Sequence, residues 1–539
     1  MPTWARIALV GVPVAFLAYF FVYPVVSITV RGLAPEGAFD LGAVLDVLRD
    51  EGLRSIAWFT LWQAAASTVI TVVVAFPAAW AFARFDFAGK RILEAVTLVP
   101  FVLPTLVVGT AFLALVGPRG ALGVDLTGSV WLILIAHVFY NYAIVVRGVG
   151  AYWARMGPST GEAATLLGAP PWTVFRTVTL PMLRPAITSA SALVFLFSFT
   201  SFGVVLLLGD LSTSTIEVEI WRQATAFLRL DVAAILAILQ MIGVGVILVL
   251  YGRYQRRTTV TIEHETRQLR RPTGRRQRLG VGLAIGSMIA IIGIPLGFLV
   301  ARSFVEPGGH VGLGNYTALT SLATTSAAFS DPWSAVGNSL RFALAATLIA
   351  LVIGIIASAA MTYTSERTAR SFDTFVMLPL GTSAVTIGFG FLVALDWPID
   401  LRATLVLIPI AHALVGIPFV VRTTSPTLAS IDRSLRDAAA TLGAGPLTVW
   451  RTVDLPLVTR VSLVAGAFAF AVSMGEFGAT AFIARPDTPT MPIAIFRLLG
   501  RPGGAPFGAA IAMCVLLMAI TALAIIAIES TRRERKDAW

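Results

Sequence analysis

"STGEAATLLGAPPWTVFRTVTLP", residues 159–181, has a close copy 275 positions later in "SLRDAAATLGAGPLTVWRTVDLP", residues 434–456. Between 167 and 181, eleven of the fifteen residues recur in the second copy. The same offset holds for much of the surrounding sequence and becomes 279 nearer the start of each half. The chain is therefore a duplication. We call these two polar stretches the first loop and the second loop.

The composition of the duplicated unit is that of a membrane protein. The 539 residues are 57% hydrophobic and 13% charged, and the mean hydropathy is +0.84. A soluble globular protein is excluded, because no core could bury so much apolar surface. Eleven stretches without Asp, Glu, Lys or Arg are long enough to cross a bilayer, which takes about 20 helical residues, and a twelfth contains only Glu476. These stretches are 7–30, 55–83, 95–118, 126–146, 185–209, 232–252, 279–301, 342–365, 374–395, 403–421, 461–484 and 502–528.

The predicted architecture is an all-α membrane protein with twelve transmembrane helices in two parallel six-helix repeats. Only helices and closed barrels satisfy the backbone in lipid, and these runs are too long for barrel strands. We expect a first repeat at 1–252, an arginine-rich linker at 253–278 and a second repeat at 279–539. Because six is an even number, both repeats enter the membrane in the same direction. A substrate path is expected on the axis between them.

The distribution of charge predicts the orientation. With a cytoplasmic N-terminus, the inside segments carry 28 of the 40 Lys and Arg residues, as the positive-inside rule requires. Both termini and both loops are then cytoplasmic, in a multi-pass protein of the inner or plasma membrane. The basic pI of 10.4 reflects topology, and no nucleic-acid partner is expected. The linker is expected to be attracted to anionic lipid headgroups.

Local sequence predicts a helix, a turn and a second helix in each loop. A capping box is expected at Ser159 with Glu162, and a weaker one at Ser434 with Asp437. A left-handed glycine is expected to end each first helix, and a proline to begin each second helix. A Leu-Pro pair is expected to stop the second helix. The glycines are Gly168 and Gly443, the starting prolines Pro171 and Pro446, and the stops Leu180-Pro181 and Leu455-Pro456.

The loops resemble a known motif. E-A-A, three residues, then G, with L-P ending thirteen residues later, is similar to the EAA loop in permease subunits of binding-protein-dependent ABC importers with the type I transmembrane fold. The first loop matches fully, whereas the second has Asp437 in place of glutamate. The resemblance covers about 55–250 and 335–530. It implies that each loop contains a coupling helix that docks on a cytoplasmic ATPase, through Glu162, Ala163, Ala164, Gly168, Asp437, Ala438, Ala439 and Gly443.

Two such loops in one chain imply a fused permease that serves both subunits of an ABC ATPase homodimer and receives its solute from an extracytoplasmic binding protein. The chain itself has no G-x-x-x-x-G-K-[ST] motif, and Lys90 and Lys536 are the only lysines. ATP hydrolysis is therefore expected in a separate subunit, and this chain is not expected to be an enzyme. No cofactor or metal site is expected, and Cys514 is the single cysteine.

The resemblance also suggests substrates. Segments 199–241 and 473–500 are similar to thiamine permeases, and fused ferric-iron permeases share the same layout. The E-F-G-A-T segment at 476–480 also resembles molybdate and sulfate importers, so an oxyanion is the alternative to thiamine or ferric iron. The candidate pore residues are His137, Ser201, His412 and Glu476.

Two interpretations are open for these pore candidates. An intramembrane carboxylate such as Glu476 is costly and suggests a functional site. Oxyanion importers with a similar acid favour a structural hydrogen bond instead, and an isolated intramembrane histidine also more often bonds a neighbouring helix.

Two other classes of protein fit twelve spans. A secondary transporter would need an ion relay inside the membrane, whereas a non-transporting scaffold or receptor would need only the loops.

Overall fold

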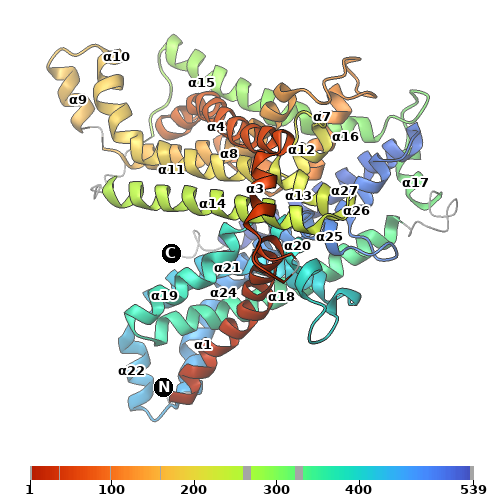
Figure 1. Cartoon of the computed structure of the whole chain (residues 1–539). Helices are drawn as coiled ribbons and strands as arrows, with labels where there is room; N and C mark the ends of the chain where they lie inside the picture. The colour runs from red at the N-terminus through yellow and green to blue at the C-terminus, as the bar shows by residue number, and fades with distance from the viewer. Residues whose placement is uncertain are drawn as a thin grey trace. The chain divides into compact units, whose positions relative to one another are not determined.

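The computed structural model describes residues 3–35, 37–97, 99–157, 159–258, 269–321 and 332–533 (Figure 1). Within these ranges the chain is helical, with two isolated β-bridges and no strand. The middle of the predicted linker, 259–268, and residues 322–331, which lie between the predicted spans 279–301 and 342–365, are outside the described residues.

Nine of the described helices are long and apolar enough to span a membrane, and two bent helix pairs raise the number to eleven. The nine are Ile7–Leu33, Glu51–Arg84, Val130–Arg155, Pro171–Phe199, Leu230–Gln255, Arg275–Ser303, Pro332–Tyr363, Leu407–Ser430 and Gly504–Ala524. The bent pairs are Glu366–Gly381 with Ala384–Ala394, at 93°, and Pro446–Thr459 with Val461–Gly475, at 53°. The remaining predicted span, 95–118, is divided into three short helices, and Pro104 stands directly before the third. A multi-pass, all-helical membrane protein is therefore supported, while the number twelve stays a prediction.

The chain forms two compact units. Unit 1 comprises Met1–Val47, Ile220–Met241 and Ser303–Trp539, and unit 2 comprises Leu48–Glu219 and Ile242–Arg302. Three helices are divided between the units, α3 (Leu41–Arg49), α13 (Ile216–Thr225) and α14 (Leu230–Thr258), and α16 (Ile294–Ser303) of unit 2 places its last residue, Ser303, in unit 1.

The other helices of unit 2 are α4 (Glu51–Arg84), α5 (Lys90–Val96), α6 (Val99–Val102), α7 (Thr105–Val116), α8 (Val130–Arg155), α9 (Ser159–Leu166), α10 (Pro171–Val174), η2 (Phe175–Thr179), α11 (Leu180–Phe199), α12 (Gly203–Leu208), α15 (Arg275–Met288), η3 (Ile289–Gly293) and α16 (Ile294–Ser303).

Those of unit 1 are α1 (Thr3–Leu17), η1 (Ala18–Val22), α2 (Tyr23–Leu33), α17 (Gly314–Ser321), α18 (Pro332–Tyr363), α19 (Glu366–Met377), η4 (Leu378–Gly381), α20 (Ala384–Ala394), η5 (Leu401–Ala403), α21 (Leu407–Ser430), α22 (Arg433–Thr441), α23 (Pro446–Val449), η6 (Trp450–Asp454), α24 (Leu455–Gly475), α25 (Thr480–Ile483), α26 (Met491–Leu499) and α27 (Gly504–Arg533).

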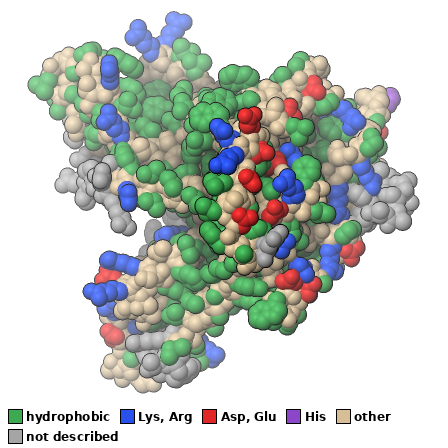
Figure 2. Space-filling view, viewed as in Figure 1, with side chains coloured by type: hydrophobic (Ala, Val, Ile, Leu, Met, Phe, Trp, Pro, Cys, Tyr) green, Lys and Arg blue, Asp and Glu red, His purple; other side chains and the backbone are tan. Residues whose placement is uncertain are grey.

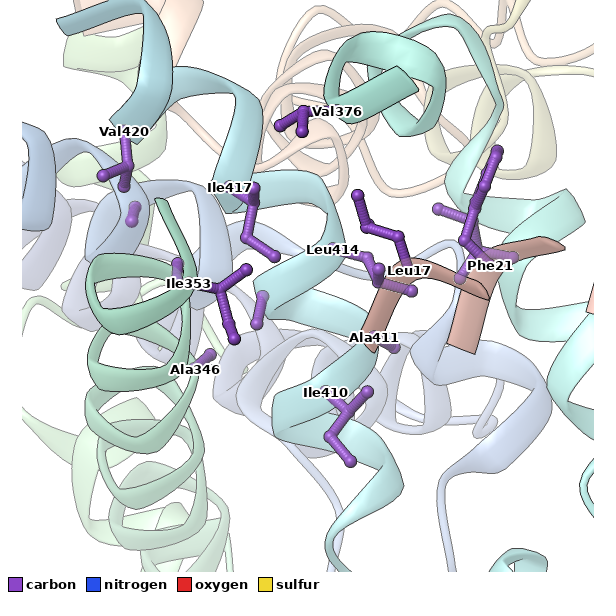
Figure 3. Close-up of a cluster of buried hydrophobic side chains, with 14 of the residues drawn as sticks. Leu17, Phe21, Ala346, Ile353, Val376, Ile410, Ala411, Leu414, Ile417 and Val420 are labelled. Atoms are coloured by element: carbon purple, nitrogen blue, oxygen red, sulfur yellow. The ribbon is translucent and has the colours of Figure 1, made fainter. Parts of the chain in front are cut away.

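The first span of each sequence half belongs to the unit built mainly from the other half. In unit 1, Leu17 of α1 and Phe21 of η1 lie against the α21 residues Ala411 and Leu414 in one buried cluster (Figure 3). In unit 2, α15 packs on α4. A Cβ on Gly280 of α15 would lie 3.1 Å from an α4 tryptophan ring, so these two helices approach closely. The compact units therefore do not coincide with the sequence halves.

Hydrophobic side chains cover much of the outer surface of these helices. Figure 2 shows them spread over a large part of the visible face. On α4, Val69 and Val73 are exposed one helical turn apart, and on α18 Leu344 and Leu348 repeat this arrangement. Such rows of exposed aliphatic residues are expected where a helix faces lipid, because lipid chains are as apolar as the side chains themselves.

Each of four spans contains one π-turn, directly before an Xaa-Pro pair. Proline lacks a backbone N–H and clashes with the carbonyl four residues earlier, and a wider turn relieves both problems. In η2, for example, the Leu180 amide donates to the Phe175 carbonyl, five residues back. The prediction that Leu180-Pro181 and Leu455-Pro456 stop a helix is therefore wrong, because the chain continues into α11 and α24. The four π-turns are η1, η2, η3 and η6, before Pro24, Pro181, Pro295 and Pro456.

The side chain of Lys90, one of the two lysines, bonds backbone carbonyls at the end of α4. Its Nζ donates to the carbonyl oxygens of Phe82, at 2.7 Å, and Phe85, at 3.0 Å. These carbonyls lie at the end of α4, where a helix leaves acceptors without partners. Burial lowers the pKa of Lys90, since the charged form loses water.

Gly388 on α20 is a position where the fold requires a glycine. A Cβ there would come within 2.6 Å of the Ala479 backbone, so Gly388→Ala forces that backbone to move. We expect the variant to lose about 1–3 kcal/mol of unfolding free energy, the usual cost of overpacking. Gly286→Ala on α15 is the control, because nothing lies within 4 Å of its added Cβ. Thermal unfolding of the purified variants measures both effects, and equal midpoints would contradict this packing.

Candidate functional site

The first loop begins with α9 and turns at Gly168. The φ of Gly168 is +86°, and its amide donates to the Thr165 carbonyl at 3.0 Å. The next amide, of Ala169, donates to the Ala164 carbonyl at 3.1 Å. These two bonds form a Schellman motif, and the predicted left-handed glycine is confirmed. The residue before α9, Pro158, and the side chain of Ser159 lie outside the described residues, so the capping box stays a prediction.

The second loop repeats this turn. Gly443 has φ +85°, its amide donates to the Ala440 carbonyl at 3.0 Å, and the following amide reaches the Ala439 carbonyl at 3.0 Å. The start of α22 differs from the predicted capping box. Asp432 caps α22 by accepting the Ser434 amide at 2.9 Å, and this bond lowers the pKa of its carboxyl group. The predicted capping box of Ser434 with Asp437 is wrong, because Asp432, two residues earlier, supplies the cap.

Both loops expose apolar side chains beside the turn. Leu166 and Leu167 are 88% and 89% exposed, and Leu442 in the second loop is 88% exposed. Trp172 and Leu447, which follow the two turns, are exposed as well. In Figure 1, α9 and α10 form a helical hairpin that projects from unit 2. Exposed leucines clustered at the end of a polar projection indicate a surface that binds another protein.

The predicted contact residues are placed similarly in the two loops. The acidic residue and the alanine after it are exposed, and the next alanine is half-buried. The exposed residues are Glu162, Ala163, Asp437 and Ala438, and the half-buried residues are Ala164 and Ala439. The two glycines are exposed and carry no side chain into the surface.

The loop glycines offer a direct test of the turn. Gly168→Ala and Gly443→Ala each put a Cβ on a left-handed residue, which costs about 1–2 kcal/mol. We expect faster amide exchange in α9 or α22, respectively, by about five- to thirtyfold. Gly445→Ala is the control, because Gly445 has φ −67° and open space around it. Equal exchange in all three variants would argue against the two turns.

A buried polar cluster in unit 1 contains His412 and Glu476. His412 Nε2 lies 3.2 Å from Glu476 Oε2 and 2.8 Å from the Thr480 hydroxyl, while Nδ1 lies 2.7 Å from the Ser473 hydroxyl. The Glu476 carboxylate also accepts the Ala479 amide at 2.8 Å and the Thr480 hydroxyl at 2.6 Å. Both carboxylate oxygens therefore have protein partners, and the cluster joins α21 to the turn between α24 and α25.

A similar cluster in unit 2 contains His137 and Ser201. His137 Nε2 lies 2.8 Å from the Ser201 hydroxyl, and Nδ1 lies 3.0 Å from the hydroxyl of Ser67. Ser201 occupies the repeat position of Glu476, and His137 that of His412. The structure thus brings the four predicted pore residues together in two equivalent pairs, each pair buried inside one unit.

Two segments of the chain, 71–260 and 350–534, match the family described as binding-protein-dependent transport system inner membrane component. Together they cover more than half of the sequence, and each lies in one sequence half. The chain belongs to this family. It carries two copies of the family's domain, so it is a fused permease of binding-protein-dependent ABC import.

Two curated relatives match the permease over most of its length, and a third matches about a third of it. The thiamine transport system permease protein ThiP of Brucella abortus (strain 2308) is 28% identical over 545 residues, covering 98% of this chain and 96% of the relative. The probable ABC transporter permease protein y4fN of Sinorhizobium fredii is 26% identical, covering 90% and 89%. The putative 2-aminoethylphosphonate transport system permease protein PhnV of Salmonella typhimurium is 34% identical over 198 residues, covering 36% and 74%.

Several members of the two buried polar clusters were not predicted from the sequence. Ser67 and Thr480 bond the two histidines, and Gln63 and Asn141 bond Ser198 beside the first histidine. The repeat contained one signal for these cluster residues, because Ser198 and Ser473 recur at the constant offset of 275. Across the described residues, no group of three His, Cys, Asp or Glu side chains could hold a metal ion.

Proposed function

We propose that this permease forms the membrane path of an ABC importer for thiamine, driven by a separate ATPase homodimer that docks on the first and second loops. The observation that carries the proposal is the duplicated projection. Each loop ends its first helix at a left-handed glycine beside a leucine that is 88% exposed or more. An exposed apolar tip suits a surface on which another protein docks.

The family and the names of relatives support this function. Import by the family depends on a solute-binding protein, so we propose such a protein on the outer face and both loops and termini on the cytoplasmic face. Thiamine is proposed because the ThiP relatives match nearly the whole length of this chain. No observation on the chain favours ferric iron over thiamine. Closure of the ATPase dimer on ATP would pull α9 and α22 together and shift the attached spans.

Reconstitution tests the coupling. We expect ATP turnover when the permease is placed in nanodiscs with an ATPase encoded by a neighbouring gene, and a rise in turnover when the liganded binding protein is added. A permease without the ATPase is the control. Solute uptake that needs a proton gradient but no ATP would overturn the proposal in favour of a secondary transporter.

Calorimetry on the binding protein tests the substrate separately. Thiamine and its phosphates are expected to bind, whereas ferric iron, molybdate and 2-aminoethylphosphonate are not. Binding of one of these other solutes alone would overturn thiamine while leaving the ABC importer class intact.

A further inference from the structure

A buried ion pair anchors the second loop. Arg436 of α22 donates from Nε to Asp454 Oδ1 at 2.8 Å, and its Nη2 lies 2.8 Å from the same oxygen. The Asp454 side chain is 0% exposed and that of Arg436 is 14% exposed. The Tyr363 hydroxyl donates to the other carboxylate oxygen, and the guanidinium lies over the tyrosine ring, 5.6 Å from its centroid.

The ion pair connects four elements of unit 1. Arg436 belongs to α22, Asp454 ends η6 directly before α24, and Tyr363 ends α18. Arg436 Nη2 also donates to the Leu428 carbonyl in the last turn of α21, at 3.1 Å. Removing one partner of a buried, hydrogen-bonded pair leaves an uncompensated charge, so this contact holds α22 strongly against three spans.

The equivalent positions in the first loop cannot form this ion pair, because two of the three residues there are uncharged. The repeat offsets place Gly161 at the position of Arg436, Thr179 at that of Asp454 and Arg84 at that of Tyr363. These three residues line a cavity of about 160 Å³ instead. Met156, the counterpart of Ile431, lines it too. The cavity therefore occupies the place that the ion pair fills in the other unit.

The ion pair found on α9 is of a weaker kind. Glu162 lies 3.8 Å from Arg270 of the linker, and the two side chains are 56% and 73% exposed. Exposed pairs of this kind contribute little to stability and are screened by salt. Linker residue Arg270 is itself held beside the first loop by backbone bonds to Arg84 and Asp86.

We propose that the two coupling loops are mechanically unequal: Arg436, Asp454 and Tyr363 clamp the second loop rigidly to its spans, whereas the first loop is compliant. These three are positioning residues, since they act on the ATPase only through α22. The consequence for coupling rests on the proposed function, but the difference in rigidity does not. The second loop then transmits most of the movement of the ATPase to the spans, and the first loop transmits less.

Amide exchange on the intact permease tests rigidity. We expect α22 amides to exchange at least about tenfold more slowly than α9 amides. Arg436→Gly with Asp454→Thr copies the first loop into the second and should bring α22 to the rate of α9. Gly161→Arg with Thr179→Asp builds the pair into the first loop and should slow α9. A Cβ at Gly161 meets only a Val174 methyl group, at 3.8 Å, so the position accepts a side chain.

Two further variants separate the clamp from general damage. Asp454→Asn keeps the shape but removes the charge, and should speed α22 exchange without changing the exchange of α21. Arg436→Asp with Asp454→Arg reverses the pair and should restore part of the slow exchange. Equal exchange of α9 and α22 in the unmodified permease, or an unchanged α22 in Arg436→Gly with Asp454→Thr, would overturn the proposal.

Turnover gives the functional measure. With the ATPase and binding protein present, Arg436→Gly with Asp454→Thr should lower the stimulation of ATP turnover by the binding protein at least about threefold, a difference of about 0.7 kcal/mol. Stimulation equal to that of the unmodified permease would overturn the role of the clamp in coupling. Failure of the unmodified permease to respond would instead reject the proposed function, and the exchange rates would still decide the clamp.

Discussion

The double variant Ala164→Glu, Ala439→Glu is expected to lower binding-protein-stimulated ATP turnover at least about a hundredfold, which corresponds to about 2.7 kcal/mol. Both alanines are half-buried on loop helices whose neighbouring leucines are exposed. A glutamate there adds bulk and a charge at the centre of the proposed ATPase contact. Burying an unpaired charge in an interface costs several kcal/mol, so docking should fail at both loops.

The measurement is ATP turnover in nanodiscs, together with co-purification of the ATPase. Ala164→Ser with Ala439→Ser is the matched control, because serine is nearly as small and carries no charge. Thermal unfolding of the permease alone should show that the double variant is folded. Unchanged turnover in a folded double variant would mean that the loops do not contact the ATPase.

Glu476→Ala is expected to be the most destabilising single substitution among the predicted site residues. Its carboxylate accepts bonds from the Ala479 amide, the Thr480 amide and the Thr480 hydroxyl, at 2.6–3.1 Å, and lies beside His412. Alanine would leave these buried donors without an acceptor. We expect a loss of about 3–5 kcal/mol, the range for breaking a buried charged contact.

Thermal unfolding of variants at the two equivalent positions checks this expectation. Glu476→Gln keeps an acceptor oxygen and should lose less than alanine. Ser201→Ala, at the same position in the first repeat, removes a single hydroxyl bond and should cost about 1 kcal/mol. If Glu476→Ala keeps its stability but abolishes solute uptake, the residue contacts the substrate, and the structural interpretation is wrong.

The sequence predicted the loops well because their geometry is local. Gly168 and Gly443 are predicted as left-handed caps from their position at the end of each first loop helix, and the structure confirms both. Predictions failed where a neighbour competed. Asp432 displaced Ser434 as the cap of α22, and π-turns allowed the helices to continue through Pro181 and Pro456. Neither the strength of a competing cap nor the width of a helical turn is visible in a hydrophobic pattern.

The sequence by itself determined that the chain is helical, embedded in a membrane and duplicated, and where its two loops lie. Hydropathy and backbone hydrogen bonding act within a segment, so these properties follow from neighbouring residues. Only the tertiary structure decided that His412 meets Glu476, and that Arg436 meets Asp454 while Gly161 lines a cavity. These contacts depend on how separate helices pack, so two loops with the same turn acquire different attachments.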